Sequence, residues 1–320
     1  MSKNTKIWLI IAIFLMLIGY IFFCGTMNKL KWDFTKLSTI VFETNEYEIY
    51  DNFKDIKIIT DTANIEFVTS EESNSLVICD EQKNVNHLVK VKDDTLLIEV
   101  HDNRKWYEHI GINFSTSKIT IYLPENDYGK LLVESSTGNI NIPKSFKFKS
   151  IDILVSTGDI MNYASVYDNI KIKTSTGNIR VENISANMLD FSTSTGNIDV
   201  VNVNCYSDIN VNVSTGKTNV TNANCKSIIS SGSTGNVSLN SVIAIEKFWV
   251  KRSTGDVSFK DCDANEIYIN TDTGDVQGNL LTDKVFFVQS DTGNIDVPKT
   301  ISDEKCEIIT DTGNIKITID

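Results

Sequence analysis

Three Asp-Thr-Gly triplets near the carboxyl end carry the residue types of the aspartic-protease signature. The triplets begin at Asp272, Asp291 and Asp311. Protease chemistry needs two carboxylates from separate lobes that share one proton. Here the triplets fall in successive copies of one repeat, and other copies, such as the one at Ser175, have Ser in place of Asp. We therefore interpret the triplets as turn residues.

The same carboxylates could still form a row that recruits a cation. Asp272 and Asp291 are expected to stack one repeat apart, with Asp311 next and Asp275 across the corner. Ca²⁺ takes several oxygen ligands, which this edge could supply in part. The spacing does not match the nine-residue repeat of Ca²⁺-binding β-rolls. We therefore favour solvated turn residues over a metal site here, and no cofactor is expected.

An aromatic residue recurs at one position in what the spacing indicates are three consecutive repeats. These residues are Trp249, Tyr268 and Phe287, each on the outward side of its predicted strand. Exposed rings beside hydrogen-bonding groups can hold a sugar chain or a protein partner. Cross-strand stacking for stability is the alternative. The flanking residues of this candidate binding site are Lys251, Asn270, Gln289, Asp272 and Asp291.

The cysteines and histidines show no metal-binding spacing. There is no Cys-x-x-Cys pair, and His87, His101 and His109 all precede the regular repeats. Cys205 and Cys225 occupy equivalent positions in adjacent repeats, so they are predicted to stack at a separation compatible with a disulfide. Such a bond suits an extracellular domain, and free thiols are the alternative.

The sequence favours a non-enzymatic protein. It has no Ser/His/Asp set and no phosphate-binding loop. Many right-handed β-helices are polysaccharide lyases or hydrolases, so a carbohydrate-active enzyme is the rival class. Such a site needs clustered acids and a base on one outer face. The nearest approach to it is Lys251 beside Asp272 and Asp291.

A repeat of nearly constant length positions all these residues. Its Thr recurs every 19 or 20 residues, which is typical of a repeat architecture. Apolar residues lie four and six positions before each Thr, and this period-two alternation predicts a half-buried strand. Gly follows Thr and permits a sharp corner, after which the alternation resumes. The repeated threonines are Thr137, Thr157, Thr176, Thr195, Thr215, Thr234, Thr254, Thr273, Thr292 and Thr312.

These patterns predict an all-β chain that forms a right-handed parallel β-helix, or β-solenoid, over residues 131–320. About ten turns at about 4.8 Å per turn would give a rod about 50 Å long. The strand edge at Asp320 has no visible cap and could pair with another copy of the chain.

One inward position conflicts with this scheme. Arg252 falls on an inward row, and Ser230 and Gly232 fall on inward rows of the preceding turn. An unpaired buried guanidinium is very unfavourable. Either a bulge turns Arg252 outward, or the small residues make room for water.

The amino-terminal part predicts a membrane anchor, with its flanks, over residues 1–31. Residues 7–23 are uncharged and almost wholly apolar, at the lower length limit for a spanning helix. Lys3 and Lys6 precede them and place the amino terminus in the cytoplasm. An uncleaved, single-pass anchor is favoured over a cleaved signal peptide or a lipoprotein at Cys24. The remaining domain would then be extracellular.

Residues 32–130 are predicted to contain a linker and an irregular β cap. Strand-like stretches are separated there by a polar excursion that holds Trp106 and Tyr107. A solenoid needs an atypical terminal unit to cover the open end of its core.

The charge excludes one class of partner. The first 31 residues hold four Lys and no acid, so the remainder has 30 − 4 = 26 basic and 42 acidic residues. Such a surface repels nucleic acid and favours cationic partners.

The chain resembles the bacterial putative-adhesin domain family with β-strand repeats, whose function is unknown. The resemblance covers residues 38–320 and includes the Thr-Gly-Asn/Asp-Ile/Val repeats, a degenerate copy at Asp61 to Ile65, and Ile121 to Pro124 before the regular part. It implies a membrane-anchored, extracytoplasmic β-solenoid, with some relatives linked to envelope stress. It supplies no catalytic residues.

We therefore expect a non-catalytic binding or scaffold module at the cell envelope, with envelope-stress sensing as one role for it. Its expected partners are the membrane, through the amino-terminal helix, and an envelope polymer, a cationic peptide or a membrane protein. A surface adhesin that binds glycans or host partners is the alternative.

Overall fold

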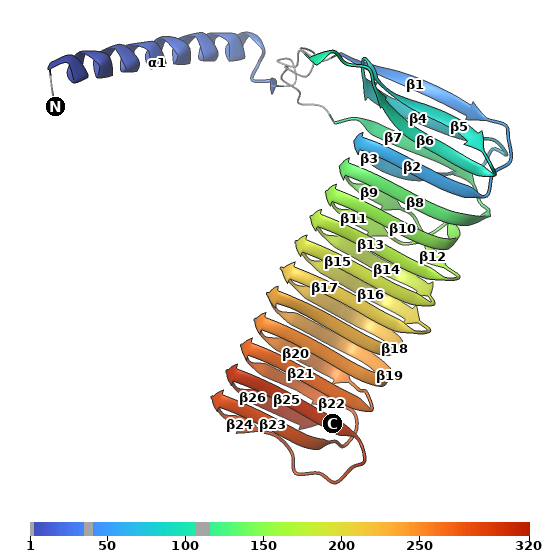
Figure 1. Ribbon diagram of the computed structural model, residues 1–320, viewed down its shortest axis with the longest axis vertical. Coiled ribbons are helices and arrows are strands. Elements are labelled where there is room, and N and C mark those ends of the chain that lie inside the picture. The colour runs from blue at the N-terminus through green and yellow to red at the C-terminus, as the bar shows by residue number, and fades with distance from the viewer. Residues whose placement is uncertain (1–2, 35–40, 107–115) are drawn as a thin grey trace.

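Each repeat folds into one turn of a β-solenoid, because apolar side chains on alternate positions can all face one interior. A computed structural model describes residues 3–34, 41–106 and 116–320. Every strand of this described part belongs to one continuous sheet that winds along a rod (Figure 1). The predicted fold class is confirmed.

A typical turn contains three short strand segments separated by two corners. In the turn that begins at Asn169, the first segment ends at Thr176, and Gly177 makes the first corner with φ 145°. The next strand, Ile179–Ala186, bends at Asn183, which has φ 57°. Asn tolerates this left-handed conformation better than most residues.

The strands have the following bounds: β1 Phe42–Ile49, β2 Asp55–Thr62, β3 Asn64–Ser70, β4 Ser75–Gln82, β5 Val85–Lys92, β6 Thr95–Asp102, β7 Lys118–Pro124, β8 Asp127–Thr137, β9 Ile140–Ile142, β10 Lys147–Thr157, β11 Ile160–Asn162, β12 Ser165–Val166, β13 Asn169–Thr176, β14 Ile179–Ala186, β15 Met188–Thr195, β16 Ile198–Cys205, β17 Asp208–Thr215, β18 Thr218–Thr234, β19 Val237–Thr254, β20 Val257–Cys262, β21 Glu266–Thr273, β22 Val276–Leu280, β23 Val285–Thr292, β24 Ile295–Asp296, β25 Lys305–Thr312 and β26 Ile315–Ile319.

The turns stack in parallel with equivalent residues aligned. Ile151 pairs with Ile170, and Thr157 pairs with Thr176. At the first corner, a side-chain oxygen of each turn accepts the backbone N–H of the next, as Asn178 Oδ1 does from Asn197 at 2.9 Å. This ladder of hydrogen bonds explains why Asn or Asp follows the corner Gly in most turns.

The order of turns along the rod differs from their order in the sequence at both ends. At the carboxyl end, β25 lies between β21 and β23, and β26 lies between β22 and β24. At the amino end, β2 lies between β6 and β8. The open edge at the carboxyl end is therefore formed by β23 and β24, together with the last residues of β26. β26 pairs with β24 only at Ile315 and Lys316, so residues 317–319 leave an open strand edge near Asp320, as predicted.

A buried lysine clamps the loops that make this crossing. Lys284 precedes β23, and its side chain is fully buried. Its Nζ contacts Asp263 Oδ1 at 2.7 Å and also binds Glu304, which lies just before β25. Thr282 Oγ1 completes the contacts of the ammonium group. The ion pairs thus join both crossing loops to the preceding turn.

Arg252 stays in the interior, so the alternative that a bulge turns it outward is wrong. Its side chain donates to the Val213 carbonyl at 3.0 Å, Thr218 Oγ1 at 2.7 Å and Ser230 Oγ at 3.2 Å. A Cβ at Gly232 would lie 1.7 Å from Arg252 Nη1, so the guanidinium occupies the space that Gly leaves. Burial lowers the pKa of Arg252 to about 10, so the group is still charged at neutral pH.

The amino-terminal region contains more regular structure than the predicted linker and cap. Within residues 32–130, strands β2, β3, β6 and β7 form two further solenoid turns, while β1, β4 and β5 pair in antiparallel fashion. The helix α1 spans Lys3–Lys29, which is longer than the predicted 7–23. It lies beyond the amino-terminal end of the rod (Figure 1).

We expect Gly196→Ala to destabilise the solenoid by about 2–4 kcal/mol. Gly196 has φ 147°, and a Cβ there would lie 1.9 Å from the Gly177 carbonyl oxygen. Thermal unfolding followed by circular dichroism checks this. Gly25→Ala is the control, because its new Cβ would meet no atom within 4 Å. Equal stability of the two variants would contradict the role assigned to the corner.

We expect Lys284→Met to loosen the two crossed turns, since it leaves Asp263 and Glu304 without their shared cation. Only the ammonium group is fully buried, because the Asp263 and Glu304 side chains are 20% and 37% exposed. The loss of its charge-assisted hydrogen bonds costs about 1.5–3 kcal/mol. Hydrogen exchange should accelerate in β23 and β25 and remain unchanged in β13. Lys299→Met is the control, because Lys299 is exposed in the same region. If β23 and β25 exchanged at the same rate in the two variants, the role assigned to Lys284 would be contradicted.

Candidate functional site

The strongest candidate surface is the outward side of β18, β19, β21, β25 and β23, which we call the distal face. Trp249 and Tyr268 are register partners there, on β19 and β21. Their ring centroids are 6.2 Å apart and their planes are inclined by 16°. Both side chains are half-buried, so one side of the stacked pair is available to solvent. Lys251 and Asn270 lie side by side in the next outward row.

The predicted row of three consecutive aromatic residues is wrong in its third member. Tyr268 pairs with Glu307, and Glu307 pairs in turn with Phe287. The inserted strand β25 therefore separates Phe287 from the stacked pair. Lys305 Nζ lies 5.1 Å from the centre of the Phe287 ring and contacts Glu307 Oε2 at 2.7 Å. Phe287 consequently has a charged environment instead of an aromatic neighbour.

The same insertion changes the rest of the predicted site. Ile309 lies between Asn270 and Gln289. Gln289 Nε2 donates to Asp291 Oδ1 at 3.2 Å, within its own strand. Only the portion formed by Trp249, Tyr268 and their immediate neighbours remains a continuous surface.

The three acidic residues of the Asp-Thr-Gly triplets form one column at the corner edge. The Thr residues that follow them pair in the order Thr273, Thr312 and Thr292, so Asp311 lies between Asp272 and Asp291. All three are exposed and belong to adjacent turns of a single face. The carboxylates therefore have the arrangement of turn residues, with no second lobe opposite them in the described part of the chain.

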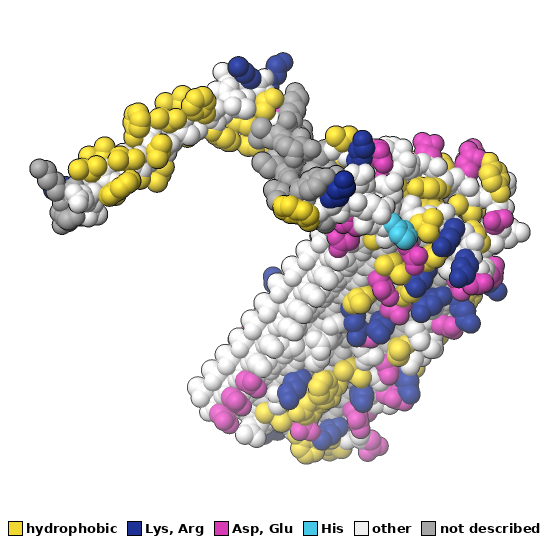
Figure 2. Space-filling view, turned by 45° about the horizontal axis from the view of Figure 1, so that its top comes forward, with side chains coloured by type: hydrophobic (Ala, Val, Ile, Leu, Met, Phe, Trp, Pro, Cys, Tyr) yellow, Lys and Arg dark blue, Asp and Glu magenta, His cyan; other side chains and the backbone are white. Residues whose placement is uncertain are grey.

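Asp275, the fourth predicted carboxylate, serves the corner ladder. Its Oδ1 accepts the backbone N–H of Asn314 at 2.7 Å, while its own N–H donates to Asp256. Figure 2 shows the corner edge as a pale band of uncharged side chains, with acidic side chains at one end. Within the described residues, the group of metal-ligating side chains that lies within binding distance is elsewhere, at Cys79, Glu81 and His87.

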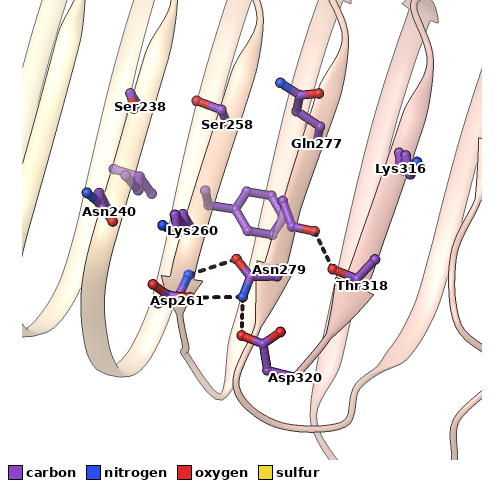
Figure 3. Close-up of a pocket in the computed structure, with 13 residues that line it drawn as sticks. Ser238, Asn240, Ser258, Lys260, Asp261, Gln277, Asn279, Lys316, Thr318 and Asp320 are labelled. Atoms are coloured by element: carbon purple, nitrogen blue, oxygen red, sulfur yellow. Dashed lines mark hydrogen bonds between the residues drawn. The ribbon is translucent and has the colours of Figure 1, made fainter.

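A groove on a second face was missed by the sequence reasoning. It has a volume of about 740 Å³ and lies over β19, β20, β22 and β26 (Figure 3). Gly278 opens its floor, because a Cβ there would lie 2.4 Å from the Phe259 ring. The available signal was Gly278 itself, which together with Asn162 interrupts a row of apolar residues five positions after the repeated Thr.

Hydrogen-bonding side chains line this groove. Asn279 exchanges hydrogen bonds with Asp261 at 2.9 and 3.0 Å and also binds Asp320 (Figure 3). Lys260 and Lys316 supply exposed positive charge to an otherwise polar surface. The groove can therefore accept a hydroxyl-rich or anionic chain, although its acids limit the net charge.

The cysteine pair lies in adjacent turns, as the repeat predicts. Asn204 pairs with Asn224, so Cys205 and Cys225 are neighbours one residue further along. Both thiols are free and buried in this structure. Cys205 donates to the Asn187 carbonyl at 3.4 Å. Burial raises the pKa of the Cys225 thiol to about 12, and the neighbouring Cys205 also raises it. The disulfide stays a prediction.

Tyr107 and His109, which were predicted in the cap region, lie outside the described residues. His101 is exposed at the end of β6, whereas His87 is buried.

Comparison with known proteins agrees with this architecture. The family model described as Toastrack DUF4097 matches residues 53–208 and 202–320. No curated protein matches the sequence.

Solved bacterial structures align with this chain at low sequence identity. A putative lipid binding protein from Parabacteroides distasonis is 17% identical, with 86% of this chain and 96% of that chain covered and a TM-score of 0.48. A putative adhesin from the same organism is 13% identical, with 86% and 97% covered and a TM-score of 0.46. A putative adhesin from Bacteroides fragilis is 16% identical, with 88% and 97% covered and a TM-score of 0.42.

We expect mild oxidation to join Cys205 to Cys225 within one chain, because the two residues occupy equivalent positions in adjacent turns. Mass spectrometry of a proteolytic digest should show the linked peptides. Cys262→Ser should still form this bond, and Cys205→Ser should not. If both thiols could still be alkylated after oxidation, the predicted disulfide would be contradicted.

Proposed function

Because the chain belongs to the Toastrack DUF4097 family, we propose that it is a non-catalytic binding or scaffold module held at the cell envelope. The observation that carries the proposal is the separation of two features on one rod. An exposed apolar helix lies at one end, and an outward stack of two aromatic rings lies near the other.

The first step is attachment to the membrane through α1. The apolar segment Asn4–Lys29 reaches a mean hydropathy of 2.8, and none of it is buried against the protein. Its 26 residues extend about 39 Å as a helix, whereas the hydrocarbon core of a bilayer is about 30 Å thick. Lys3 and Lys6 favour a cytoplasmic amino terminus. The rest of the chain is then extracellular. A cleaved signal sequence has the same composition and is the alternative.

The second step is display of the distal face away from the membrane. The ten turns of the repeats and the two turns of the amino-terminal region, at about 4.8 Å each, separate the helix from the far end by about 58 Å. That reach suits a partner inside the envelope better than one on a host cell. The role of a surface adhesin is therefore our second choice. We propose that the protein senses envelope stress by binding its partner in the envelope.

The third step is the choice of ligand. Trp249 and Tyr268 present nearly parallel rings, and Lys251 and Asn270 lie beside them. Sugar rings pack their C–H faces on aromatic rings and hydrogen-bond to neighbouring polar groups, so we propose a carbohydrate polymer of the envelope. The acidic column at Asp272 instead favours a cationic peptide, whose affinity would fall steeply with salt.

We expect Trp249→Ser with Tyr268→Ser to weaken polymer binding at least tenfold, because the loss of the stacked pair removes the apolar platform. Pull-down of the detergent-solubilised protein on isolated cell-wall polymer measures this. Phe287→Ser is the matched control, since Glu307 separates Phe287 from the pair. Equal losses in both variants, or turnover of the polymer, would contradict the proposal.

A further inference from the structure

The interior of the amino-terminal cap contains a polar cluster at a depth where most of the solenoid core is apolar. Cys79 and Glu81 are alternate inward residues of β4, and His87 points inward from β5 after the connecting turn. Their exposed fractions are 0, 0 and 3%. Such a group of ionisable side chains is costly to bury unless each member has a partner.

The three side chains converge on a small volume. One ligand atom from each residue lies within 4.8 Å of those of the other two. His87 Nδ1 lies 2.6 Å from Glu81 Oε2. A thiol, an imidazole and a carboxylate thus meet in the space between two facing sheets.

Hydrogen bonds from neighbouring residues orient the His87 ring and the Glu81 carboxylate. Thr60 Oγ1 on β2 lies 2.9 Å from His87 Nε2, which leaves Nδ1 directed inward. Asn45 Nδ2 on β1 donates to Glu81 Oε1 at 2.7 Å, and the backbone N–H of His87 donates to Oε2 at 2.8 Å. Outer contacts of this kind orient the ligands of metal sites.

We propose that Cys79, Glu81 and His87 bind a divalent transition metal, with Zn²⁺ as the best match. Zn²⁺ accepts thiolate, imidazole and carboxylate ligands, whereas Ca²⁺ and Mg²⁺ prefer oxygen alone. A tetrahedral site with Zn–S and Zn–N bonds of about 2.3 and 2.1 Å places its ligand atoms about 3.3–3.6 Å apart, so His87 Nδ1 and Glu81 Oε2, which are 2.6 Å apart, must separate to admit the metal. The metal takes the place of the Cys79 thiol proton and of the proton between His87 and Glu81. A water completes four-coordination.

The metal would link two consecutive strands that do not pair with each other. β4 pairs with β1 and β7, whereas β5 pairs with β6. A metal bound to both β4 and β5 connects these two sets of antiparallel strands. The free energy of metal binding then adds to the stability of the fold.

The same residues do not suit nucleophilic catalysis. Thr60, His87 and Glu81 have the order of a hydroxyl, imidazole and carboxylate triad. Thr60 is only 6% exposed, so a substrate carbonyl cannot approach its hydroxyl.

The test uses the full-length chain in detergent, stripped with a chelator and then supplied with Zn²⁺ or Co²⁺. We expect one Zn²⁺ per chain, a rise of several degrees in the unfolding midpoint, and a Co²⁺ spectrum with a thiolate charge-transfer band. Cys79→Ser should abolish that band, and His87→Gln should remove the Zn²⁺-dependent rise in the midpoint. Thr60→Val should weaken binding by about tenfold or more, because it frees the imidazole ring.

Cys306→Ser is the matched control, since Cys306 is equally buried but lies at the other end of the rod. It should bind metal like the unmodified chain. If Cys79→Ser does not fold, the Co²⁺ spectrum of the unmodified chain still decides the question. Substoichiometric metal, or a Co²⁺ spectrum without a thiolate band, would overturn the proposal and leave the cluster a hydrogen-bonded network.

Discussion

The close approach of successive corner glycines determines the geometry of the whole rod. At Gly196 the missing side chain leaves room for the Gly177 carbonyl, which an added Cβ would meet at 1.9 Å. Any slip of one residue would bring a side chain into that gap. The turns must therefore stack with Gly beside Gly and Thr beside Thr, so every outward row becomes straight. The hydrogen-bond ladder of Asn and Asp depends on this alignment.

The position of each residue around its turn could be predicted from the sequence, because it depends on the chemistry of neighbouring residues in the chain. Gly marks the first corner, and the alternation of residues such as Ile170 and Ile172 gives the inward rows, which the structure confirms as buried. The order of the turns along the axis of the rod could not be predicted in the same way. The repeats that contain Thr292 and Thr312 have the same motif, so counting alone gives them their sequential order. The ion pairs of Lys284 accompany the opposite order, and they depend on contacts between distant residues.

The candidate sites show the same division. The stacked Trp249 and Tyr268 follow from the repeat because their strands are consecutive both in sequence and in space. The separation of Phe287 depends on the crossing and could not be inferred from spacing. The cluster of Cys79, Glu81 and His87 was missed because it joins residues of a hairpin that lies outside the repeats. The departures from regularity thus coincide with the places where side chains of unusual chemistry gather.

The crossing at both ends has a consequence for the history of such a chain. A solenoid whose last turn in sequence is also last in space could grow by the addition of repeats after its final strand. Here β26 is already paired with β22 along its length and with β24 at Ile315 and Lys316, and β2 is enclosed between β6 and β8. New repeats can enter without disturbing either terminus only between these turns. The length of the rod should therefore evolve by duplication within the gene, with both end pieces inherited as fixed units.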